Sequence, residues 1–235
     1  EGIIPVSPAA DHVGFFVPQA ADAQIVAPLL CRDWQPLTPE HSPFLGIPDG
    51  PYLAHASPEG LAHFEATCRR LVDAGFSIKS VSIMPDFDLI YERHNIIVAA
   101  EAAQTHKDWY PGNSNLYHAK TAELIERGRQ IGEQALKEAR QGQTSLRDSL
   151  AEAMDKHGID LWLSPSAVGP APKGLESTGD PVMNLPWTHA GVPTITLPTG
   201  FNANGLPLGL QLTGRWYGDE DLLAWALLLE QTLKT

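Results

Sequence analysis

The sequence has few cysteines and a shortage of basic residues, and each shortage excludes a class of protein. Two cysteines, Cys31 and Cys68, occur among 235 residues, which is too few for a disulfide framework or a cysteine-based metal site. Lys and Arg number 16 against 28 Asp and Glu, giving a formal net charge of −12. A phosphate-binding surface needs clustered Lys and Arg, so this balance argues against direct nucleic-acid binding.

Long apolar runs are also missing. The longest, Leu222 to Leu229, has eight residues, whereas a membrane-spanning helix needs about 20. The first residues, Glu1 to Pro5, have neither the basic start nor the apolar run of a secretory signal. We therefore expect a cytoplasmic protein with no membrane span. Because no Met opens the chain, we also expect that residue 1 is not the natural start of the gene product.

The common catalytic and metal-binding motifs are absent. Nine histidines occur, but none forms His-Glu-x-x-His or a His/Cys cluster with ligand spacing, so we predict no metal and no cofactor. The sequence has no Gly-x-Ser-x-Gly, no Ser-x-x-Lys and no glycine-rich phosphate loop. The residues alone therefore reveal no catalytic constellation.

The sequence does carry the pattern of a folded α/β protein. Hydrophobic residues make up 43% and charged residues 19%, the mixture of an ordinary globular domain. Periodicity and helix breakers predict helices at 22–30, 58–74, 86–107, 121–140, 145–157 and 222–233, and strands at 76–83, 159–163, 193–197 and 208–213. Strands that alternate with helices indicate an α/β fold, a mixed β-sheet covered by helices.

One stretch, Asp160 to Asp221, is rich in proline, glycine and aromatic residues that follow short strands. A strand that stops at Ser164-Pro165 delivers the next residues to the end of a sheet, where α/β proteins place ligands. Met183 and Trp187 could then wall a partly apolar pocket. They could equally be packed in the core, and the residues alone leave both interpretations open.

The same stretch resembles the C-terminal part of the amidase signature family, serine hydrolases that cleave carboxamides. Near the start of the chain, Asp11-His12-Val13-Gly14 is similar to the family's segment just beyond its signature region. The motifs that carry the C-terminal resemblance are Asp160 to Pro165, Ala171-Pro172, Gly191 to Gly200, Gly205 to Leu212 and Asp219 to Leu223. The resemblance covers nearly the whole chain and is weakest from about Thr38 to Arg147.

This resemblance implies that the chain is the C-terminal portion of the amidase signature fold. It implies a single domain over 1–235, in which 1–37 follows the signature region, 38–157 is helical and variable, and 158–235 holds the C-terminal strands and helix. The family's Ser nucleophile, second Ser and Lys base all lie upstream of the Asp-His-Val-Gly segment. We therefore expect no catalytic residue in this chain, and no activity from the chain alone.

For the whole enzyme, the resemblance implies hydrolysis of a carboxamide to a carboxylate and ammonia or an amine through a Ser acyl-enzyme. This chain would supply the substrate-pocket wall. Its implied partners are a small amide and the missing N-terminal half, with a second copy in a homodimer as a further option. The candidate substrate-binding residues are Asp180, Met183, Asn184, Trp187, Thr188 and His189.

Two departures from the family pattern bear on the substrate. Many members have Asn where this chain has Thr188, and Asp180 lies near, but not at, the position of the substrate-binding acid in the glutamine-dependent members. Both differences favour a general amidase over a glutamine-using enzyme. Two alternatives stay open: a partner-dependent subunit of a glutamine- or tRNA-dependent amidotransferase, and a non-catalytic protein that binds a small molecule.

Overall fold

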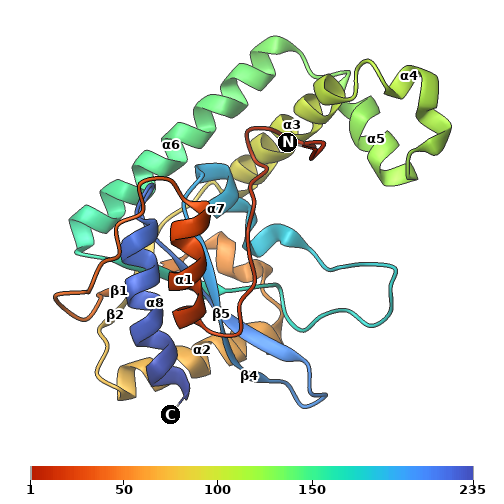
Figure 1. Ribbon diagram of the computed structural model, residues 1–235. Helices are drawn as coiled ribbons and strands as arrows, with labels where there is room; N and C mark the ends of the chain where they lie inside the picture. The colour runs from red at the N-terminus through yellow and green to blue at the C-terminus, as the bar shows by residue number, and fades with distance from the viewer. Residues whose placement is uncertain (1, 235) are drawn as a thin grey trace.

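A computed structural model describes residues 2–234, which form a five-stranded sheet flanked by helices (Figure 1). The strands are β1 (Leu45–Asp49), β2 (Ile78–Ser82), β3 (Leu161–Pro165), β4 (Thr194–Phe201) and β5 (Pro207–Thr213). The helices are α1 (Ala20–Leu30), α2 (Pro58–Asp73), α3 (Phe87–Thr105), α4 (Tyr110–Asn113), α5 (Ala119–Gly128), α6 (Glu133–His157), α7 (Leu185–Ala190) and α8 (Asp219–Lys234), with 3₁₀ turns η1 (Pro51–His55), η2 (Ser114–Leu116) and η3 (Pro181–Met183).

The strand order β2-β1-β3-β5-β4 makes the sheet mixed. β1 is parallel to both β2 and β3, whereas β5 is antiparallel to its neighbours β3 and β4. The chain therefore runs outward from β1 to β2 and then returns to the other side of β1 to form β3. This reversal beside β1 is a topological switch point. The predicted α/β fold, a mixed sheet covered by helices, is confirmed.

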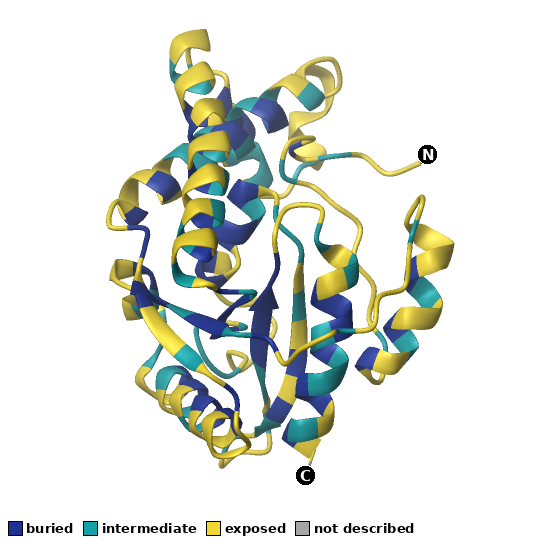
Figure 2. Ribbon diagram, turned by 90° about the vertical axis from the view of Figure 1, so that its left-hand side faces the viewer, coloured by how far each residue is buried: buried dark blue, intermediate teal, exposed yellow. Residues whose placement is uncertain are grey.

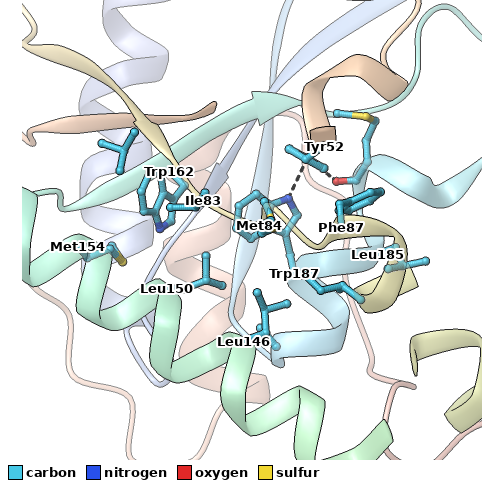
Figure 3. Packing of buried hydrophobic residues seen from close by; sticks show 14 of the residues in the cluster. Tyr52, Ile83, Met84, Phe87, Leu146, Leu150, Met154, Trp162, Leu185 and Trp187 are labelled. Carbon is cyan, nitrogen blue, oxygen red and sulfur yellow. Dashed lines mark hydrogen bonds between the residues drawn. The ribbon is translucent and has the colours of Figure 1, made fainter. Parts of the chain in front are cut away.

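Helices cover both faces of the sheet. Leu161 and Leu163 of β3 belong to a core cluster with the apolar faces of α2 and α8, and α1 packs on α8 from outside. Trp162, which lies between those leucines in β3, belongs to a second cluster with α3, α6 and α7 (Figure 3). β3 is buried along its whole length because both faces of a central strand meet helices.

The helices α3 to α6 form an arm that projects beyond the sheet (Figure 1) and is largely exposed (Figure 2). One prediction is wrong here: the separate helices at 121–140 and 145–157 are divided differently. The chain breaks between Gly128 and Glu133, and α6 then runs without interruption through Gly142. Arg93 of α3 packs on Gly142, where an added Cβ would meet its Cδ at 2.6 Å. Leu146 continues the buried face of Ala139 across this position.

β1 was not among the predicted strands. It is five residues long and contains Pro48, so it offers neither a clear alternation nor a full set of backbone donors. The other predicted helices and strands lie within a few residues of their expected positions. Ser57 caps α2 by accepting a hydrogen bond from the backbone N–H of Gly60 at 3.1 Å.

The N-terminal segment is fastened to the arm by one buried carboxylate. Glu101 of α3 accepts hydrogen bonds from the hydroxyl of Ser7 at 2.8 Å, the backbone N–H of Ala9 at 2.8 Å and the guanidinium of Arg140 at 2.7 Å. Burial alone would raise the pKa of Glu101, but these hydrogen bonds hold it below its ordinary value. The carboxylate thus joins the N-terminal segment, α3 and α6.

No helix within residues 2–234 is long and apolar enough to cross a membrane.

Candidate functional site

A buried polar network occupies the carboxyl ends of β1 and β3. These two strands are paired only at Leu45 with Leu161 and at Gly46 with Trp162, so the pairing stops before either strand ends. Beyond that point lie Tyr52, just after β1, and Ser164, near the end of β3. The carboxyl ends of parallel strands at a switch point are where α/β proteins bind ligands.

Tyr52 is the centre of this network. Its hydroxyl donates to the backbone carbonyl of Met183 at 2.7 Å and accepts from the indole N–H of Trp187 at 3.1 Å (Figure 3). The residue is fully buried. Burial raises the pKa of Tyr52 above its ordinary value, and hydrogen bonds with Ser164 and Trp187 offset part of that rise. Tyr52 is therefore a neutral hydrogen-bonding group at physiological pH.

Gln211 of β5 closes the network from the other side. Its side-chain amide donates to the hydroxyl of Ser164 at 3.1 Å and to the Met183 carbonyl at 3.3 Å. The Met183 carbonyl thus accepts from both Tyr52 and Gln211, and each lone pair of one oxygen is used. Because Met183 ends η3 just before α7, this double contact fixes η3 and α7 against the sheet.

The structure brings the six predicted site residues together on one short segment, η3 and α7 with the residue before them. Three side chains are buried in the core and three reach solvent: Met183, Trp187 and His189 are buried, Thr188 is half-buried, and Asp180 and Asn184 are exposed. Asp180 caps η3 by accepting from the backbone N–H of Val182 at 2.9 Å. The segment therefore has an apolar side that anchors it and a polar side that faces outward.

The outward polar side borders the end of β3. The amide of Asn184 donates to the backbone carbonyl of Ser166 at 3.3 Å, and the Ser166 hydroxyl donates to the carbonyl of Gly209 at 3.2 Å. Asn184, Ser166 and the β5 backbone thus form one accessible edge. Amide and hydroxyl groups of this kind can hold the polar atoms of an uncharged ligand.

His189 is buried without a hydrogen-bond partner at either ring nitrogen in the described chain. Its ring lies edge-on to His94 of α3, with 5.7 Å between ring centroids. Burial, with smaller contributions from the nearby His94 and Arg93, lowers the pKa of His189 to about 4. His189 is therefore neutral at physiological pH.

Within the described part of the chain, this network contains no acidic side chain and no cluster of metal-binding side chains. Within residues 2–234, no three His, Cys, Asp or Glu side chains gather in a way that could hold a metal ion. A large groove, about 520 Å³, lies elsewhere, between Val81–Pro85 and the second half of α6, and none of the six predicted residues lines it. The polar groups of the network are buried and hydrogen-bonded to one another, so the network holds η3 and α7 in place.

Tyr52, Ser164 and Gln211 were not among the predicted site residues. Gln211 carries a usable signal, since it is a polar residue in the otherwise apolar run from Leu208 to Leu212. A buried polar residue in a strand requires a partner. Tyr52 lies in a proline-rich stretch with no periodicity, and only the fold places it beside Trp187.

The comparisons with known proteins agree with this architecture. A family model described as Amidase matches residues 1–223. A glutamyl-tRNA(Gln) amidotransferase subunit of Synechococcus sp. is 27% identical, and the match covers 98% of this chain and 56% of that protein. The corresponding protein of Thermosynechococcus vestitus is 35% identical over 101 residues, which is 40% of this chain and 20% of that protein.

Solved structures give the same result. A structure titled "Crystal structure of amidase" is 27% identical with a TM-score of 0.88, and the match covers 98% of this chain and 55% of that one. A fatty acid amide hydrolase shares the fold at 19% identity and a TM-score of 0.73, over 86% of this chain and 42% of that one. The chain spans about half the length of the relatives that it matches from end to end. Because the family model covers residues 1–223, the chain belongs to the amidase (amidase signature) family.

Proposed function

We propose that this chain is the substrate-side part of an amidase that hydrolyses a carboxamide to a carboxylate and ammonia or an amine. The observation that carries the proposal is the end-to-end match to an amidase structure, with a TM-score of 0.88 at 27% identity over 98% of the chain. The catalytic Ser, second Ser and Lys would come from a segment upstream of residue 1. The division into 1–37, 38–157 and 158–235 remains part of this proposal.

The chemistry would proceed in two steps. The upstream Ser oxygen attacks the amide carbon, the C–N bond breaks, and the proton from Ser passes to the leaving nitrogen. Water then attacks the acyl-enzyme ester, releasing the carboxylate and restoring the Ser hydroxyl. Backbone N–H groups upstream would stabilise the oxyanion of each tetrahedral intermediate.

The residues of this chain would shape the acyl side of the pocket. The polar side of η3 and α7, with Asp180, Asn184 and Thr188, would face the substrate, while Met183, Trp187 and His189 would hold the segment from behind. The double hydrogen bond to the Met183 carbonyl supports this arrangement, because a wall that discriminates between substrates must be held rigidly.

The exposed apolar surface supports a covering partner. Phe16 is fully exposed, and Ile25 and Leu29 of α1 are exposed on one face of that helix, four residues apart. β4 is an edge strand of the sheet. Large apolar patches and unpaired edges are usually covered in a stable protein, and we propose the upstream half as the cover.

A second candidate is partner-dependent amide transfer. The Synechococcus and Thermosynechococcus relatives are both named as glutamyl-tRNA(Gln) amidotransferase subunits. In that role the complete protein would release ammonia from glutamine for use by a partner protein. Thr188 and the position of Asp180 favour the general amidase, since they depart from the pattern of the glutamine-dependent members.

Ammonia release from a panel of aliphatic and aromatic amides, with glutamine included, tests these proposals. We expect no ammonia release from the 235-residue chain alone. We expect the protein from the complete gene to hydrolyse simple amides. Glutamine as the preferred substrate would select the amidotransferase candidate. Tight binding of amides without turnover by the complete protein would select a binding protein, and turnover by this chain alone would overturn the account of the catalytic residues.

A further inference from the structure

Two buried polar atoms on the α6 side of the sheet have no hydrogen-bond partner within residues 2–234. They are the indole nitrogen of Trp162 in β3 and the hydroxyl oxygen of Thr213 in β5. Both residues are 1% exposed. They stand directly opposite each other in the antiparallel register of the two strands, so their side chains share one face of the sheet. An unpaired buried donor is costly, and two on neighbouring positions require an explanation.

A small cavity lies beside both residues. Its volume is about 30 Å³, and Trp162 and Thr213 line it together with Leu150 and Met154 of α6. Figure 3 shows the Trp162 ring against these two α6 residues. One water needs roughly 10–15 Å³ of such space and two to four polar partners. The cavity is therefore large enough for a water molecule, and two of the residues that line it carry the unpaired polar atoms.

The wall of the cavity is completed by residues that are themselves fixed. Arg147 of α6 donates from Nε to the carbonyl of Ala190, the last residue of α7, at 2.7 Å. Its guanidinium carbon lies 3.9 Å from the centre of the Trp216 ring, and both Arg147 and Trp216 line the cavity. These two contacts fix Arg147 at the edge of the cavity, beside Trp216.

We propose that one internal water molecule occupies this cavity and bridges the two strands. The water accepts a hydrogen bond from the Trp162 indole N–H and shares a second with the Thr213 hydroxyl. Leu150 and Met154 give the cavity an apolar wall on the α6 side, which suits a single neutral molecule. The water is a structural ligand that satisfies both buried groups and joins β3 to β5 beneath α6.

The Thr213→Val variant distinguishes an occupied cavity from an empty one by the sign of its effect. Valine has nearly the shape of threonine but no hydroxyl. If the water is present, the variant removes one of its partners, and we expect the midpoint of urea unfolding to fall. If the cavity is empty, the variant removes an unpaired hydroxyl, and the midpoint should rise; that outcome overturns the proposal.

Thr67→Val is the matched control, because Thr67 is equally buried and its hydroxyl donates to the carbonyl of His63 at 2.9 Å. Its midpoint should fall, which establishes that the urea assay detects the loss of one hydrogen bond made by a hydroxyl group.

A direct measurement covers the case in which a variant fails to fold. In the unaltered chain, the Trp162 indole N–H, assigned with Trp162→Phe, should show a nuclear Overhauser contact to a long-lived water. Absence of that contact also refutes the proposal.

Discussion

Tyr52 connects segments that are far apart in the chain through one hydroxyl group. The hydroxyl contacts Met183, 131 residues away, and Trp187, 135 residues away. The ring packs between Phe87 and Trp187, with centroid separations of 5.5 and 5.6 Å. The side chain thus supplies both apolar packing and the hydrogen bonds that hold η3 and α7, and the two contributions can be separated by mutation.

Tyr52→Phe keeps the ring and removes the hydroxyl. The Trp187 indole N–H then loses its acceptor, and the Met183 carbonyl keeps only Gln211. We expect the free energy of unfolding in urea to fall by about 1–2 kcal/mol, the cost of leaving a buried donor unpaired. Tyr91→Phe is the control, since Tyr91 is 40% exposed and should change stability by less than about 0.5 kcal/mol. Equal effects of the two variants would contradict the role assigned to Tyr52.

His189 makes the stability of the fold depend on pH. Its pKa is about 4 in the folded chain and 6.5 as an ordinary value, with burial as the main cause. The unfolded chain therefore takes up this proton at higher pH than the folded chain does. The contribution of neutral His189 to the free energy of unfolding is therefore complete above about pH 6.5. It is lost as the pH falls toward 4. The difference between the two pKa values corresponds to at most about 3 kcal/mol.

We expect His189→Leu to lose less free energy of unfolding than the unaltered chain between about pH 7 and pH 4, as measured in urea at a series of pH values. His12→Leu is the control for replacing a histidine at an exposed position. His94 also titrates in this region with a pKa lowered by burial, so some pH dependence should survive in the leucine variant. Identical profiles for His189→Leu and the unaltered chain would refute the assignment.

At the scale of the helices, the turn between α5 and α6 depends on close packing rather than on local sequence preference. Gly128, the last residue of α5, lies so tightly against α3 that an added Cβ would overlap the carbonyl group of Ala99. Gly132, just before α6, has open space around its Cα. Both are glycines near helix ends, and only the tertiary contact distinguishes them.

Gly128→Ala should therefore destabilise the chain by about 1–3 kcal/mol, the usual cost of overpacking, although alanine is intrinsically the better helix former. Gly132→Ala should cost less than about 1 kcal/mol, the loss of a favourable N-cap residue. Thermal unfolding followed by circular dichroism measures both. If Gly128→Ala is the more stable of the two, α5 does not pack against α3 in this way.

The same comparison explains the misplaced helix break. Gly142 looks like a break in the sequence because it lies in a polar stretch, yet it accommodates the Arg93 side chain within α6. The periodic apolar residues Leu146, Leu150 and Met154 correctly predict the second half of that helix. Periodicity thus locates a helix, whereas a glycine ends or continues it according to the residue that packs on it.

At the scale of the whole molecule, the apolar surface is unevenly covered. The central strand β3 and the helix faces that pack on it are buried, while α1 and the N-terminal segment carry exposed apolar residues (Figure 2). Ile25 and Leu29 are 69% and 80% exposed, and residues four apart lie on one face of a helix. An apolar helix face of this kind favours association when nothing covers it.

We expect the isolated 235-residue chain to associate or to be poorly soluble, measured by size-exclusion chromatography with light scattering. The double variant Ile25→Glu/Leu29→Glu should shift the chain toward the monomer. Leu175→Glu serves as the control, because Leu175 is fully exposed in the loop before η3, away from α1. A monodisperse, stable monomer from the unaltered chain would count against an uncovered interface.

The sequence by itself determined the family and the alternation of strands and helices, and it predicts the segment from Asp180 to His189 as the place of the candidate residues. These features depend on motifs and on local periodicity, which are patterns formed by residues close together in the sequence. Only the tertiary structure decided that Tyr52 and Gln211 share the Met183 carbonyl and that Trp162 and Thr213 face one cavity. Such contacts depend on strand order and register, and these are set by packing between residues far apart in the chain.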